Sequence, residues 1–173
     1  MGKKIIRFGL SVRDIDRAMR ELEQYKRDII RKTDLLREKV AERIAELSKD
    51  GFAGAVVDDL MKDGQRAAQV KVSTDQCDNI TLVIAQGEDA VWVEFGAGVH
   101  YNGTVGTSPH PKGSELGFTI GGYGKGMGKK DVWGFDEDGK LRLTHGAPAT
   151  MPMYNAVKTV CDEIAEIARE VFQ

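Results

Sequence analysis

The chain has 173 residues, of which 41% are hydrophobic and 30% charged, and its formal net charge is −2. This composition fits one globular domain, and the small net charge excludes a chain that binds nucleic acid through its overall electrostatics. Two distant cysteines, Cys77 and Cys161, exclude a disulfide framework. No apolar run approaches the ~20 residues that cross a bilayer, and the first residues lack a signal-peptide pattern. We therefore expect a cytoplasmic protein without a membrane partner.

The first strong element is a long helix over residues 12–49. Ser11, followed three residues later by Asp14, fits a capping box with Asp in place of the usual Glu. Asp50-Gly51 supplies a stop, because glycine suits the left-handed conformation that follows many helices. Apolar residues recur at spacings of three, four and seven between charged ones, which predicts one apolar stripe. The stripe contains Ile15, Met19, Leu22, Ile29, Leu36, Val40, Ile44 and Leu47.

The length of this helix is informative in itself. At a rise of ~1.5 Å per residue, about 36 residues of it would span roughly 54 Å, whereas a compact domain of this size is roughly 40 Å across. The helix must therefore extend beyond its own domain, bend, or break into two packed helices near Thr33-Asp34. An extended helix would carry part of its apolar stripe beyond the domain, and that part would need a partner.

Alternation of apolar and polar residues predicts three antiparallel strands within residues 68–96. Turns at Asp78-Asn79 and Gly87-Glu88-Asp89 separate the strands, so we expect a meander with one buried face. Residues 97–130 differ, because they hold ten of the chain's 20 glycines and show no regular apolar spacing. Ordering so many glycines is entropically costly, so we expect a long mobile loop.

A hairpin is predicted over residues 131–144, because Asp138-Gly139 is a strong turn signal. The last helix is predicted over residues 150–172, with Thr150 as N-cap and Pro152 in the first turn. These elements predict an α+β fold, in which the first and last helices pack on an antiparallel sheet of three to five strands. The expected core is Val70, Val72, Ile80, Leu82, Ile84, Val91, Val93, Phe95, Val157, Val160, Ile164 and Ile167.

Residues that could carry chemistry do not form a catalytic or metal-binding pattern. His100, His110 and His145 have no H-x-x-x-H spacing and no neighbouring cysteine, which favours exposed loop histidines over a zinc site. The glycine run at residues 121–128 matches neither a P-loop nor G-x-G-x-x-G. We therefore predict no enzymatic activity, no cofactor and no metal. Four lysines of the loop could attract DNA phosphates weakly: Lys112, Lys125, Lys129 and Lys130.

Two segments carry a resemblance to a known family. Val93-Glu94-Phe95-Gly96-Ala97-Gly98 resembles the V-E-F-G-[TS]-G segment of minor structural proteins that join head and tail in long-tailed bacteriophages. Gly146-Ala147-Pro148, followed by Pro152 and the last helix, resembles the proline turn before the final helix of these proteins. The family is often labelled tail-completion, tail-component or neck protein.

The resemblance implies a non-enzymatic virion protein of the phage or prophage neck or tail end, present in the host cytoplasm during assembly. Family members form rings, commonly of six subunits, between the portal side of the head and the tail tube. The implied partners are further copies, neighbouring neck or connector and tail-tube proteins, and transiently the genomic DNA. The expected assembly contacts are Ile15, Leu22, Ile29, Leu36, Glu94, Phe95, Gly96 and Gly98.

Two other classes of function compete with this interpretation. A non-phage structural adaptor built on a coiled-coil-like helix would use the same apolar stripe. An enzyme could use residues 97–130 as an active-site lid, but the sequence lacks a nucleophile–base pair or a metal-ligand set to place beneath it.

Overall fold

The structure is a computed structural model that describes residues 5–59, 64–96, 100–101, 104–105, 108–118 and 133–173. Three helices and eight short strands follow one another in these residues, which confirms the α+β fold. In chain order they are α1 (Val12–Ala53), β1 (Val56–Asp59), β2 (Gly64–Ala67), β3 (Lys71–Cys77), β4 (Ile80–Gln86), α2 (Ala90–Phe95), β5 (His100–Tyr101), β6 (Thr104–Val105), β7 (Trp133–Glu137), β8 (Lys140–Thr144) and α3 (Pro152–Phe172).

Helix α1 is one continuous helix of 42 residues, without a break at Thr33-Asp34. At ~1.5 Å per residue it is about 63 Å long. The predicted cap is confirmed, because the Ser11 hydroxyl accepts the Asp14 N–H at 3.2 Å and donates to its carboxylate at 2.7 Å. The predicted end at residue 49 was wrong, since the helix continues to Ala53.

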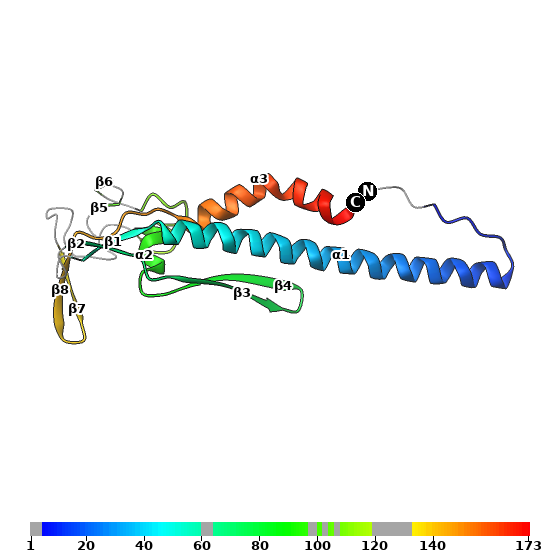
Figure 1. Cartoon of the computed structure of the whole chain (residues 1–173), viewed down its shortest axis with the longest axis horizontal. Helices are drawn as coiled ribbons and strands as arrows, with labels where there is room; N and C mark the ends of the chain where they lie inside the picture. Colours follow the sequence, from blue (N-terminus) through cyan, green and yellow to red (C-terminus); the bar gives the residue numbers. More distant parts are fainter. Residues whose placement is uncertain (1–4, 60–63, 97–99, 102–103, 106–107, 119–132) are drawn as a thin grey trace.

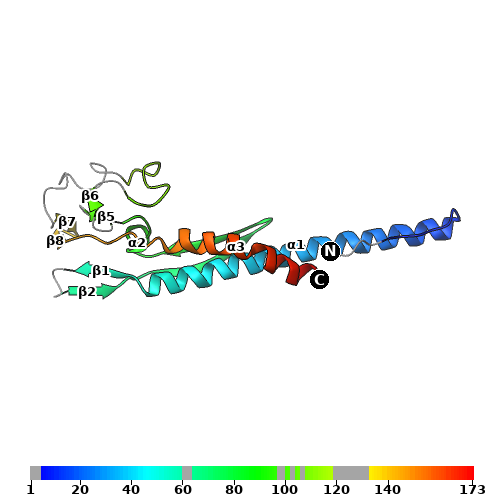
Figure 2. The same ribbon diagram turned by 90° about the horizontal axis from the view of Figure 1, so that it is seen from above.

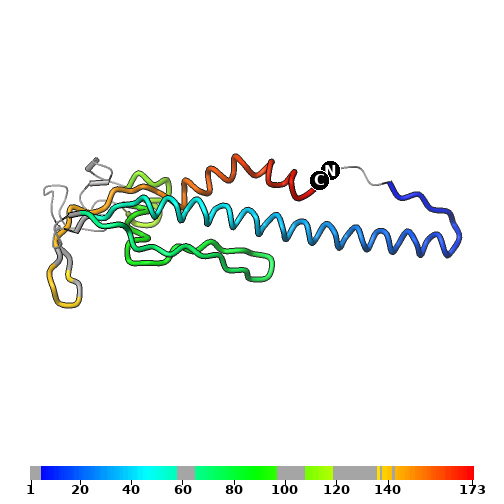
Figure 3. Tube along the Cα trace, viewed as in Figure 1, coloured from blue at the N-terminus to red at the C-terminus, as the bar shows by residue number. Residues whose placement is uncertain are grey.

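The other elements flank only part of α1 (Figures 1 and 2). Helix α3 runs antiparallel along one side of its C-terminal half, and the β3–β4 hairpin lies along another side. The Lys32 ammonium donates to the backbone oxygen of Gln173 at 2.9 Å, so the end of α3 lies level with Lys32. Residues 12–31 of α1, which we call the arm, extend beyond both elements (Figure 3).

In the described part of the chain, the strands form four separate two-stranded antiparallel sheets instead of the expected single sheet of three to five strands. The predicted meander was therefore wrong: β3 pairs with β4, and the third segment folds as α2. The predicted hairpin at residues 131–144 is confirmed from residue 133 onward. Asp138 and Gly139 both have positive φ values, 54° and 76°, as a two-residue type I′ turn requires.

The core lies where the C-terminal end of α1 meets α2, the start of α3 and the first strands. Phe52, Ala55 and Val93 form its buried centre. Of the expected core residues, Val93 and Val160 are buried, whereas several others are exposed because narrow two-stranded sheets and an edge helix cover little surface. The exposed members of the predicted core are Ile80, Leu82, Val91, Val157 and Ile164.

Gly51 allows α1 and α3 to approach each other closely. A Cβ at this position would lie 2.9 Å from the Pro152 Cβ and 3.3 Å from its Cα. Gly51 is therefore a helix residue whose missing side chain admits the first residue of α3, and not the left-handed terminator that the sequence suggested.

We expect Gly51→Ala to destabilise the chain by about 1–2 kcal/mol, because overpacking at the Pro152 contact outweighs the gain in helix propensity. The matched control is Gly54→Ala, since a Cβ at Gly54 would meet only ordinary contacts, at 3.7 and 3.8 Å. Denaturant unfolding measures both changes. Equal stability of the two variants would contradict the proposed close approach.

An ion pair joins α1 and α3 halfway along their contact. The Arg43 guanidinium donates to the Glu163 carboxylate at 3.0 Å and to Glu46 at 2.8 Å. The hydrogen bond from Arg43 lowers the pKa of Glu163 below its ordinary value, although desolvation opposes this shift. The hydrogen bond from Glu163 raises the pKa of Arg43 in return.

A carboxyl group whose pKa is lower in the folded chain stabilises the fold above its unfolded pKa, near 4.3, and loses this contribution as the pH falls through its folded pKa. We therefore expect Glu163→Gln to lower the melting temperature at pH 7 and to match the wild type in strong acid. Melting curves between pH 2 and pH 7 test this, with Glu166→Gln as the control neutralisation. A deficit that persists unchanged in strong acid would exclude this linkage.

Candidate functional site

The segment Val93-Glu94-Phe95-Gly96 forms the end of α2, and not the edge of a sheet. Gly96 terminates this helix with φ 82° and ψ 155°, a conformation that is essentially restricted to glycine. Its N–H donates to the Trp92 carbonyl at 2.7 Å. Gly96 therefore has a backbone role inside the chain, where a side chain could not be accommodated without strain.

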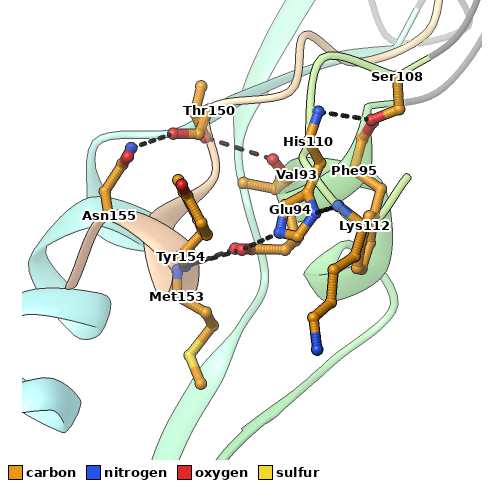
Figure 4. A network of polar contacts seen from close by, with 10 residues as sticks. All are labelled: Val93, Glu94, Phe95, Ser108, His110, Lys112, Thr150, Met153, Tyr154 and Asn155. Carbon is orange, nitrogen blue, oxygen red and sulfur yellow. Dashed lines mark hydrogen bonds and ion pairs between the residues drawn. The ribbon is translucent and has the colours of Figure 1, made fainter. Parts of the chain in front are cut away.

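Glu94 caps helix α3 from another part of the chain (Figure 4). The residue is only 7% exposed. One carboxylate oxygen accepts the Met153 N–H at 2.8 Å, and the other accepts the Tyr154 N–H at 2.9 Å. The first N–H groups of a helix have no acceptor within the helix, and they carry partial positive charge. A carboxylate at this position accepts their hydrogen bonds and balances that charge.

The backbone beside Glu94 binds the residues that precede α3. The Val93 carbonyl accepts the Thr150 N–H at 3.0 Å and the Met151 N–H at 3.4 Å. Thr150 is thus not the N-cap that the sequence predicted; Met151 occupies that position in a left-handed conformation, with φ 54° and ψ 51°. Because Met151 has no side chain that could cap the helix, Glu94 supplies the missing acceptors.

These contacts join the two segments on which the family resemblance depends. We call Val93, Glu94, Thr150, Met153 and Tyr154 the Glu94 junction. The sequence pattern placed Glu94 on the face opposite Val93 and Phe95, where it would bond neighbouring backbone or a subunit contact. The opposite face was wrong, since Glu94 is buried, and its carboxylate bonds backbone, that of α3. In a strand, neighbouring side chains alternate between faces, whereas the short helix α2 allows both Val93 and Glu94 to be buried.

His110 also belongs to this site, although we expected an exposed loop histidine. It is buried, and its Nδ1 accepts the Lys112 N–H at 3.0 Å. Its Nε2 lies 3.3 Å from the Glu94 carboxylate, so the Nε2–H tautomer donates to Glu94. The imidazole also packs on the Phe95 ring, with centroids 4.4 Å apart.

Residues 108–118 form a packed segment of the region expected to be one mobile loop. The Ser108 hydroxyl donates to the Phe95 carbonyl, and the Phe118 ring stacks on Phe95 at 4.3 Å between centroids. Ser108 and Phe118 are both buried, so this segment covers α2. Lys112 is exposed on it. The other loop lysines, Lys125, Lys129 and Lys130, and Gly98 lie outside the described residues.

Sequence reasoning missed a second buried carboxylate at the start of α2. Asp89 binds the Arg66 guanidinium through both oxygens, at 2.5 and 2.9 Å, and accepts the Gln69 N–H at 2.7 Å. It therefore ties α2 to β2 and to the start of β3. An Asp directly before the apolar run Ala90-Val91-Trp92-Val93 is a helix-start signal, and it could have indicated α2.

The arm presents a second candidate site, an apolar surface on an otherwise charged helix. Ile15 is 40% exposed, and Met19 and Leu22 are each 56% exposed. Ile29 and Leu36, from the same predicted stripe, are half-buried. The stripe is thus partly covered from Ile29 onward and more exposed at Ile15, Met19 and Leu22.

Within the described ranges, no group of three or more His, Cys, Asp or Glu side chains is placed to hold a metal ion. None of the helices in the same part of the chain combines the length and the apolar character that crossing a membrane requires. No protein-family model matches the chain, and no curated protein or solved structure matches it either.

We expect Glu94→Ala to lower the free energy of unfolding by about 2–4 kcal/mol, because it leaves the partly buried N–H groups of Met153 and Tyr154 without acceptors. Glu94→Gln should cost less, since its amide oxygen can still accept one of the two N–H groups. The matched control is Glu115→Ala on the exposed side of the 108–118 segment. Denaturant unfolding that ranks Glu94→Ala with the control would exclude the capping role.

Proposed function

We propose that this chain is a structural subunit of a long-tailed bacteriophage that forms a ring at the neck or tail end and joins or completes head and tail. The arm supports this proposal most directly. It displays Ile15, Met19 and Leu22 to solvent on a helix that extends beyond the elements flanking it. A contiguous apolar surface of this kind usually marks a protein–protein contact.

The Glu94 junction supports the proposal in a different way. The V-E-F-G segment and the proline turn, whose sequences resemble the neck family, contact each other through Glu94 and Val93. The two segments are far apart in sequence, yet they form one structural unit. A shared structural unit explains why both segments would occur together in a family that uses this arrangement.

In this proposal the chain works by contact between surfaces, without catalytic turnover. Its partners are further copies in a ring of six, the number common in the family that the chain resembles. Neighbouring connector and tail-tube proteins are the other partners. The exposed Lys112 and the three lysines outside the described residues would face passing DNA. The protein would assemble in the host cytoplasm and remain in the virion.

Removal of the gene from the phage or prophage genome tests the proposal. We expect full heads and finished tails that fail to join, or tails of faulty length, when lysates are examined by electron microscopy. Complementation with the wild-type chain should restore infectious particles. Normal tailed, infectious particles made without the protein would exclude the neck assignment and leave the non-phage adaptor as the better hypothesis.

The same complementation can examine the arm. The double variant Ile15→Glu/Leu22→Glu should fail to restore joining while keeping its unfolding midpoint, because both side chains are exposed. Arg20→Glu is the matched control, since it also changes the net charge by −2 but stands on another face of the arm. Equal complementation by both variants would show that the apolar stripe is not used.

A further inference from the structure

Helix α3 carries an apolar surface that the chain itself leaves open. Tyr154, Val157 and Ile164 are 37%, 43% and 46% exposed, and Cys161 is exposed between them. Their spacings of three, four and three residues place them on one face of the helix. We call these four residues the α3 seam. The buried residues Ala156 and Val160 lie on the adjoining face, which packs within the chain, and Val171 continues the row of Val157 and Ile164 but is buried.

The arm carries a matching surface. Ile15, Met19 and Leu22, which we call the arm seam, follow spacings of four and three residues and are exposed. Both seams therefore have the heptad pattern of helices that pack along each other, with side chains of one fitting between those of the other.

The two seams cannot meet within one chain. Helix α3 ends level with Lys32, where the Gln173 backbone oxygen is bound, and the arm begins beyond that point. The arm belongs to the same continuous helix that α3 packs against, so it cannot fold back onto α3. Any contact between the seams must join two molecules.

We propose that the arm seam of one copy packs antiparallel on the α3 seam of a second copy. The inference rests on the proposed function as a self-assembling subunit and names the surfaces that the ring would use. The antiparallel direction repeats the relation that α1 and α3 already have within the chain.

Charge at the edge of the seams favours this direction and one register. Glu23 follows Leu22 on the arm, and Lys158 follows Val157 on α3; both are exposed. In an antiparallel pair, the residues that directly follow these seam positions meet along the same edge. Setting Leu22 of one copy opposite Cys161 of the next brings Glu23 beside Lys158 and Met19 beside Ile164. Glu23 at the edge of the arm seam thus faces Lys158 at the edge of the α3 seam.

This contact is head-to-tail, because each copy offers one arm and receives another arm on α3. A repeated contact of this kind closes into a ring when its rotation allows and otherwise continues as a filament. Each seam is small, so a single contact is weak, and the several contacts of a closed assembly reinforce one another.

Disulfide trapping in the full-length chain tests the proposal, since Cys161 already lies in the α3 seam. The background is Cys77→Ser, which removes the other exposed thiol. Leu22→Cys in this background should form disulfide-linked multimers under mild oxidation at high protein concentration. Peptide mapping should join position 22 to Cys161. Arg20→Cys, on another face of the arm, is the matched control, and Leu22→Cys with Cys161→Ser should lose this linkage.

A charge exchange tests the register with the same readout. Glu23→Lys and Lys158→Glu should each slow the trapping of Leu22→Cys by about two- to threefold, as expected for one exposed ion pair. The double exchange should restore the wild-type rate. If either substitution slowed trapping only by disturbing the fold, the second substitution would not restore the rate.

The inference is overturned if Leu22→Cys links to Cys161 no faster than Arg20→Cys does, or if the double exchange fails to restore the rate. Should the gene be required for head–tail joining while trapping fails, the proposed function stands and these surfaces are wrong. Should trapping succeed while phages assemble normally without the gene, the contact stands and the neck assignment fails.

Discussion

The carboxylate of Glu94 is buried, so its charge must be compensated inside the chain, and the start of α3 supplies that compensation. The start of α3 also depends on Glu94, because no side chain of its own caps this helix. Without Glu94, the N–H groups of Met153 and Tyr154 would have no acceptors. This contact fixes where α3 begins. It therefore also fixes the crossing of Pro152 over Gly51 and the path of α3 along α1.

His110 and Phe95 extend this constraint to the 108–118 segment. The imidazole bridges the Lys112 backbone and the Glu94 carboxylate, so the segment is attached to the same charge that starts α3. The aromatic stack of Phe95 and Phe118 then covers α2. Parts of the chain that are distant in sequence thus converge on one short helix of six residues.

The elements that sequence alone predicted well are those decided by local chemistry. Helix α1 has a cap at Ser11 and a long apolar period, and the hairpin at Asp138-Gly139 has a turn that only a few residue types allow. The α2 segment was mistaken for a strand because the alternation of Val91, Val93 and Phe95 is too short to separate the two periods. The helical conformation of this segment is decided by the hydrogen bonds of Asp89 and Glu94 to residues far away in the sequence. The same applies to His110, since no local pattern reveals that a loop histidine will be buried against a carboxylate.

The continuity of α1 has a mechanical consequence. No Gly or Pro lies between Val12 and Asp50, so nothing in the sequence of that span provides a hinge. The helix is a stiff lever whose short end is clamped in the core at Phe52 and whose long end is the arm. A small change of angle at the tip is transmitted to the point where Gly51 leaves no space beside Pro152. Load applied to the far end of the molecule is thus felt at the contact between α1 and the start of α3.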